Sequence, residues 1–245
     1  MKMITLDSTK SYSIPDIYLN IGHLLDHFMM LIFAKAAFDA GREFGLSYEQ
    51  IIVYGPLGVV LFGAAAPLAG WLADKYSRAI LITIYPFGLA FGSILAALSS
   101  STIMLGISLG IVGFFAAIYH PVGIAMITKR PGKVGLRLGV NGVWGNMGVA
   151  IAPILTGFLI LYSDWRLAFI VPSLICFCFG ISQIFAFIEL EENKLQDNSN
   201  NAKKDSSITS EGWQTVLVCL SVVTLSGGFI FGSLTFLIPR LFEVN

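Results

Sequence analysis

The side chains best suited to chemistry stand inside an apolar stretch near the N-terminus. His23, Asp26 and His27 interrupt a run that is otherwise largely hydrophobic. At about 100° of rotation per residue, the three side chains share one face of a helix. His120, the third of the chain's 3 histidines, interrupts a second apolar stretch. Ionisable groups inside a membrane segment are costly, so they are by default candidates for a functional site.

Helical geometry places these groups at comparable depth. If the first stretch runs outward and the stretch around His120 runs inward, His27 lies near mid-membrane and His120 about 9 Å toward the cytoplasm, at about 1.5 Å per residue. His23 falls at a similar level. Histidine titrates near neutral pH. We therefore predict that the three histidines and Asp26 form a proton-responsive site; a static hydrogen-bonded network that holds the helices together is the alternative.

The elements that must position these groups are membrane helices. The 245 residues are 56% hydrophobic and only 12% charged, with a mean hydropathy of +0.78, whereas soluble domains carry about 25% charged residues. Apolar stretches long enough to cross a bilayer recur along the chain. They must be helical, since a lone strand in lipid leaves its backbone groups unpaired. We predict seven spans, at residues 17–39, 50–73, 79–99, 102–127, 136–162, 166–189 and 213–240.

The distribution of basic residues sets the orientation. With the N-terminus inside, 11 of the 15 Lys and Arg residues fall in cytoplasmic segments and 4 in or near outer ones, as the positive-inside rule requires. The predicted organisation is a cytoplasmic N-terminus (1–16), a six-helix bundle (17–189), a polar, flexible cytoplasmic linker (190–212) and a seventh membrane helix (213–245). Near the outer end of the first helix we expect Lys35 to pair with Asp39.

Several classes of function are excluded or disfavoured. The formal net charge is zero, so nothing indicates a nucleic-acid partner. There is no HExxH and no GxSxG sequence for an enzyme, and no GxxxxGK[ST] loop for nucleotide. A retinal receptor would need a lysine in its last helix, and residues 213–238 have none. The three cysteines lie in apolar stretches without metal-ligand spacing and are expected to be small buried hydrophobes. We predict no cofactor and no metal site.

One loop carries a family motif. Between the second and third predicted helices the chain reads GWLADKYSR, from Gly70 to Arg78. This resembles the signature loop of the major facilitator superfamily, Gly-x-x-x-Asp-Arg/Lys-x-Gly-Arg/Lys, at Gly70, Asp74, Lys75 and Arg78, with Ser77 in place of the usual glycine. The resemblance implies the superfamily's all-α fold, of which this chain would hold the N-terminal six-helix bundle plus one further helix. It also implies that the loop biases the protein toward its outward-open state.

Weaker features extend the resemblance. The fifth predicted helix is rich in small residues and carries Asn141 and Asn146, both candidate substrate-binding residues. Gly142, Gly145 and Gly148 would form a ridge for close helix packing. Three features resemble the fosmidomycin resistance protein group: the cluster of His23, Asp26 and His27, the sequence Tyr119-His120-Pro121, and this fifth helix. No arginine occurs in 103–127, so the proton mechanism of drug antiporters with an arginine there is not carried over.

The expected function is secondary active transport. The resemblance implies alternating access in the cell (inner) membrane, and the titratable cluster favours proton-coupled efflux of a drug or small anionic metabolite. The alternative is a proton-independent uniporter of the same fold; a seven-helix receptor is disfavoured. The expected partners are a small-molecule substrate, the lipid bilayer and a missing C-terminal half-transporter, because six helices, a linker and one helix indicate a truncated form.

Overall fold

The described part of the protein is a bundle of long helices. The computed structural model describes residues 14–130, 133–197 and six single positions between 218 and 234, with side chains described up to residue 185 and at those six positions. The helices are α1 (Ile14–Glu43), α2 (Tyr48–Ile51), α3 (Pro56–Lys75), α4 (Arg78–Ala97), α5 (Thr102–Ala116), α6 (Tyr119–Thr128), α7 (Val134–Tyr162) and α8 (Leu167–Asp197), with the 3₁₀ turn η1 (Ile52–Tyr54) after α2. No strand occurs among the described residues, so the all-α prediction is confirmed.

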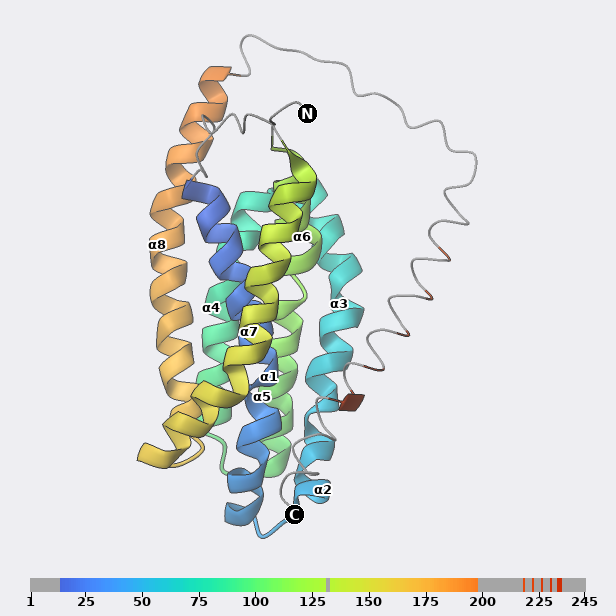
Figure 1. Cartoon of the computed structure of the whole chain (residues 1–245), viewed down its shortest axis with the longest axis vertical. Coiled ribbons are helices and arrows are strands. Elements are labelled where there is room, and N and C mark those ends of the chain that lie inside the picture. The colour runs from blue at the N-terminus through green and yellow to red at the C-terminus, as the bar shows by residue number, and fades with distance from the viewer. Residues whose placement is uncertain are drawn as a thin grey trace, which may run out of the picture.

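Six helical segments of the described chain are long and apolar enough to cross a membrane. They coincide with the first six predicted spans, and the second and fourth each combine shorter helices, α2 to α3 and α5 to α6. The start of α1, the α6 helix and the end of α8 lie at one end of the bundle, whereas α2 lies at the opposite end (Figure 1). This alternation is the one that six consecutive spans require.

The fourth predicted span is not one continuous helix. The backbone breaks between α5 and α6, just before Tyr119. Pro121 explains the break, because its ring clashes with the carbonyl of the residue four positions earlier and it has no N–H to donate. The amide of Ile118 instead donates to the carbonyl of Phe115 in a tighter turn. The break leaves Tyr119 and His120 in the first turn of α6, where they face α1.

The C-terminal part of the prediction, from the linker onward, is partly contradicted and partly outside the described residues. The helix α8 continues to Asp197, so it enters the segment predicted as a linker from residue 190; its Glu, Leu and Lys residues there have high helix propensity. Of the predicted seventh helix, six positions are described, each helical: 218, 222, 226, 230, 233 and 234. The rest of that prediction, the remaining linker residues and residues 1–13 lie outside the described residues.

Glycines set the closest helix contacts. A Cβ at Gly148 of α7 would lie 2.2 Å from the backbone oxygen of Leu24 in α1, and one at Gly113 of α5 would lie 1.9 Å from that of Gly58 in α3. Two of the three predicted ridge glycines, Gly145 and Gly148, therefore make the close approach of α7 to α1 possible. The prediction is wrong for Gly142, whose Cβ would meet nothing within 4 Å.

At the α2 end of the bundle, charged side chains join the connections between helices. Glu43 accepts hydrogen bonds from two nitrogens of Arg166 and, at 2.8 Å, from the indole of Trp165. This hydrogen bonding raises the pKa of Arg166 above its usual value. The expected pair between Lys35 and Asp39 is wrong: Asp39 lies 3.4 Å from Arg42 instead, and Lys35 lies over the ring of Phe38.

Candidate functional site

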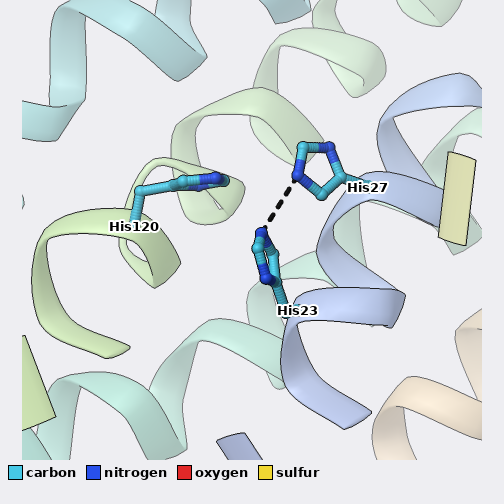
Figure 2. Close-up of side chains that lie close together, drawn as sticks. All are labelled: His23, His27 and His120. Atoms are coloured by element: carbon cyan, nitrogen blue, oxygen red, sulfur yellow. Dashed lines mark hydrogen bonds between the residues drawn. The ribbon is translucent and has the colours of Figure 1, made fainter. Parts of the chain in front are cut away.

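The predicted cluster of titratable side chains exists, and α1 and α6 position it. His23 and His27 occupy successive turns of α1, and His120 projects toward them from the first turn of α6 (Figure 2). The ring centroids of His23 and His120 are 5.1 Å apart, and those of His27 and His120 are 5.3 Å apart. The three rings thus meet in one place within the bundle, although the chain brings in the third from a separate helix.

Hydrogen bonds fix the orientation of His23. Its Nδ1 lies 2.8 Å from the backbone oxygen of Asn141 in α7. A carbonyl can only accept, so Nδ1 must carry the proton, and in the neutral ring Nε2 then offers a lone pair. The Nε2 of His27 lies 3.1 Å from Nε2 of His23 and donates to it. The ring of His23 also stacks on Tyr119, with the centroids 4.9 Å apart.

Asp26 is the most enclosed charged group of the site. Its exposed fraction is 0%, and neither carboxylate oxygen accepts a hydrogen bond. The nearest ionisable partner is Nδ1 of His120, at 3.4 Å from Oδ2. A buried carboxylate without hydrogen bonds is strongly disfavoured unless a proton or a cation compensates it. Asp26 is therefore the group of the cluster whose negative charge most needs compensation.

Asn141 joins the helices that carry the cluster. Its side-chain nitrogen donates to Oδ1 of Asn20 at 3.0 Å and to the hydroxyl of Tyr119 at 2.9 Å. Tyr119 in turn donates to the backbone oxygen of Leu19. These groups belong to α1, α6 and α7, so one buried network holds the three helices together next to the histidines. Sequence reasoning selected Asn141 but not Tyr119's role as its partner, which depends on the helix break.

Asn146, the other predicted asparagine, lies elsewhere. It is exposed on α7 and takes no part in the network around Asn141. Gly145, its neighbour, faces the cluster instead: a Cβ there would lie 2.7 Å from the ring of His23. The glycine thus leaves the space that the imidazole occupies. The cluster itself comprises His23, Asp26, His27 and His120, and Asn141 supports it.

The motif loop, Gly70 to Arg78, connects α3 and α4, as the sequence predicted. Asp74 and Arg78 form an ion pair across one turn, and the ammonium of Lys75 lies 4.7 Å from the ring centre of Trp71. Ser77, which replaces the usual glycine, accepts a hydrogen bond from the amide of Ile80 and so caps α4. Gly70 is not needed for a close approach in this conformation, because a Cβ there would meet Pro121 at an ordinary 3.5 Å.

A second charged group at this end was missed in the sequence. Asp16 is buried at the start of α1, with Arg130 at 3.5 Å and Arg137 of α7 at 3.7 Å. Burial is the largest influence on the pKa of Arg130 and lowers it, although Asp16 opposes the effect. In the sequence, both arginines were already explained by the positive-inside rule. Their pairing with Asp16 became visible only from their positions in the structure.

The profile of the Major Facilitator Superfamily matches residues 19–244. The chain belongs to this superfamily. The match covers the bundle and extends into the predicted seventh helix, so the resemblance carried by the loop motif is confirmed. The narrower resemblance to the fosmidomycin resistance protein group is compatible with this assignment and stays a prediction.

Individual proteins agree with the assignment. The chain is 24% identical over 205 residues to a "Probable hexose phosphate transport protein" of Chlamydia pneumoniae, covering 80% of this chain and 45% of that protein. It is 29% identical over 132 residues to a "Multidrug resistance protein B homolog" of Mycobacterium tuberculosis, covering 53% and 24%. The crystal structure of a peptide transporter, POT, has a TM-score of 0.59 at 16% identity, covering 91% of this chain and 46% of that one.

The matched proteins indicate the class of this protein and how much of their length the chain spans. The superfamily and the matched proteins are membrane transporters, not enzymes. The chain is therefore a multi-pass membrane protein of a transporter family. It spans less than half the length of the relatives described above.

Proposed function

We propose that the bundle is half of a secondary active transporter that exports a small molecule by alternating access, driven by the proton gradient. The observation that carries the proposal is the cluster of His23, Asp26, His27 and His120 inside a membrane bundle of the Major Facilitator Superfamily. Polar groups within a membrane bundle typically mark substrate or ion pathways. We propose the inner membrane as its location, with the N-terminus in the cytoplasm.

The position of the cluster supports a transport site. In this fold each half is built from inverted three-helix repeats, and substrate and coupling ions bind near the midplane at their interface. The first helices of the two repeats correspond to α1 and to α5–α6, and these are the helices that carry the four side chains. His27 and His120 remain partly exposed, so a substrate can reach the cluster from the side where a second bundle would lie.

A second bundle is part of the proposal. Only 22% of the residues in the apolar core of the α2–α3 span are buried, and only 28% in that of α7. In the α1 span the share is 61%. A second six-helix bundle would cover part of this exposed surface and close the cavity around the cluster. We propose that transport requires it, supplied by the same polypeptide or by another.

Transport by the complete protein in liposomes tests the coupling. Vesicles with an acidic lumen, containing inside-out protein, should accumulate the exported substrate, and a protonophore should abolish the accumulation. The candidate substrates to be tested are hexose phosphates and a set of drugs, because one relative is named for hexose phosphate transport and another for multidrug resistance. Flux down the substrate gradient that ignores the imposed pH difference would refute proton coupling and establish a uniporter of the same fold.

A further inference from the structure

We propose that His23, His27 and His120 form a binding site for a borderline divalent transition-metal ion, with Zn²⁺ as the type case. One ring nitrogen from each histidine lies within 4.8 Å of the others. In a tetrahedral zinc site with Zn–N bonds of about 2.0–2.1 Å, the ligand nitrogens are about 3.3–3.4 Å apart. The pair His23 and His27, at 3.1 Å, is already near this spacing, and His120 reaches it by a small movement of its side chain.

The hydrogen bonds around the rings favour metal ligation over simple packing. Histidine ligands usually donate their other ring N–H to a carbonyl or a carboxylate, which fixes the ring and its tautomer. His23 does so with the carbonyl of Asn141 at 2.8 Å. Nδ1 of His120 faces the carboxylate of Asp26 at 3.4 Å. In both rings, Nε2 is then the nitrogen left for a metal.

Asp26 supplies an independent reason. It is fully buried and neither of its oxygens has a hydrogen-bond partner. A divalent ion held by the three rings would lie within one imidazole of this carboxylate and would compensate its charge. Asp26 would act in the second shell of the site by orienting His120, as carboxylates do beside zinc-bound histidines.

The ligand set defines the class of ion and leaves one position open. Imidazole nitrogens suit zinc, nickel, copper and iron, whereas magnesium and calcium prefer oxygen ligands. Three protein ligands leave a fourth position for water or a substrate. The partly exposed edges of His27 and His120 give that position access. Sequence spacing predicted no metal site, because the third ligand comes from a different helix.

The inference goes beyond the proposed function and does not depend on it, because metal binding is measured without transport. The protein is purified in detergent without a polyhistidine tag, and Co²⁺ and Zn²⁺ are used as probes. No other histidine competes, since the chain has 3 in all. We expect one ion per chain, a tetrahedral Co²⁺ spectrum that Zn²⁺ abolishes, and a melting temperature raised by about 5 °C at a hundredfold excess over the dissociation constant.

Variants identify the ligands. His120→Gln should lose the Co²⁺ spectrum and the thermal shift, and Asp26→Asn should weaken binding by about 10- to 100-fold. Cys178→Ser should bind as the unaltered protein does, because Cys178 is exposed on α8 and not buried as the sequence predicted. Binding that persists undiminished in His120→Gln, or that is lost in Cys178→Ser, would overturn the proposal.

A measurement on the unaltered protein covers the case in which His120→Gln does not fold. X-ray absorption of the zinc-loaded protein should show three imidazole nitrogens around the metal. A first shell containing sulfur, a shell without three imidazoles, or the absence of stoichiometric zinc would overturn the proposal, while leaving proton-driven transport to its own test.

Discussion

At the scale of single residues, Asn141 links the helices that carry the site. One amide group connects Asn20 of α1 with Tyr119 of α6, and the backbone oxygen of the same residue orients His23. Because all of these atoms are buried, each depends on the others for its hydrogen bonds. The network therefore fixes where the histidines stand as well as how the helices pack.

Replacing Asn141 tests this dependence. Asn141→Ala should lower the free energy of unfolding by about 1–3 kcal/mol, because it leaves buried polar partners unsatisfied. The measurement is thermal unfolding in detergent followed by helical circular dichroism. The matched control is Asn146→Ala on the same helix, which is exposed and should stay within about 0.5 kcal/mol of the unaltered protein. Equal losses in the two variants would contradict the role assigned to the network.

At the scale of helices, the contact of α1 with α7 bears most directly on the site. It depends on glycines at the crossing, where a Cβ at Gly148 would overlap the backbone of Leu24. Membrane helices gain from such contacts because small residues let their backbones approach. The same approach brings the backbone oxygen of Asn141 in α7 within 2.8 Å of Nδ1 of His23.

A pair of glycine substitutions on α7 measures that effect. Gly148→Ala should destabilise the bundle by about 1–3 kcal/mol through overpacking. Gly142→Ala, whose added methyl group meets nothing within 4 Å, should be neutral or stabilise by up to about 1 kcal/mol, because alanine favours a helix. Thermal unfolding of both variants gives the comparison. A harmless Gly148→Ala would mean that α7 can shift away from α1 without loss.

The loop between α3 and α4 gives a second prediction at this scale. Asp74→Asn removes the ion pair with Arg78 and should lower the transport rate of the complete protein by shifting the balance between its inward- and outward-open states. Membrane insertion should be unchanged, since Asp74 is exposed. Initial rates are normalised to the amount in the membrane, with Lys129→Gln as the control at the same end. An unaltered rate would separate the motif from the mechanism.

The sequence predicted the helices better than their interruptions. Hydropathy alone located all six described spans, because each needs about 20 apolar residues to cross a bilayer. It did not show the break before Tyr119, since the local effect of Pro121 depends on which neighbouring groups can donate hydrogen bonds to the freed carbonyls. It placed the histidines and Asp26 together through helical geometry, but the hydrogen bond from His23 to α7 and the cluster around Asp16 depend on contacts between distant segments.

At the scale of the whole molecule, the cluster faces a side that the described helices do not close. His27 and His120 are partly exposed, and α3 and α7 are the least buried spans. Alternating access needs two bundles that rock around the site between them. The 245-residue chain reconstituted alone should therefore show no saturable flux, whereas the complete transporter should. Saturable flux from the isolated chain would show that a second bundle is unnecessary.

The most direct test of the account is the transport rate of the complete protein after a single change in the cluster. His120→Gln keeps a polar side chain but removes the imidazole that joins α6 to His23, His27 and Asp26. The account predicts an initial rate in proteoliposomes at least about tenfold lower per folded molecule, since one lost interaction of about 1.4 kcal/mol or more is a factor of ten. Cys178→Ser should keep the full rate. A His120→Gln variant that transports at the rate of the unaltered protein would contradict the claim that this cluster is the functional site.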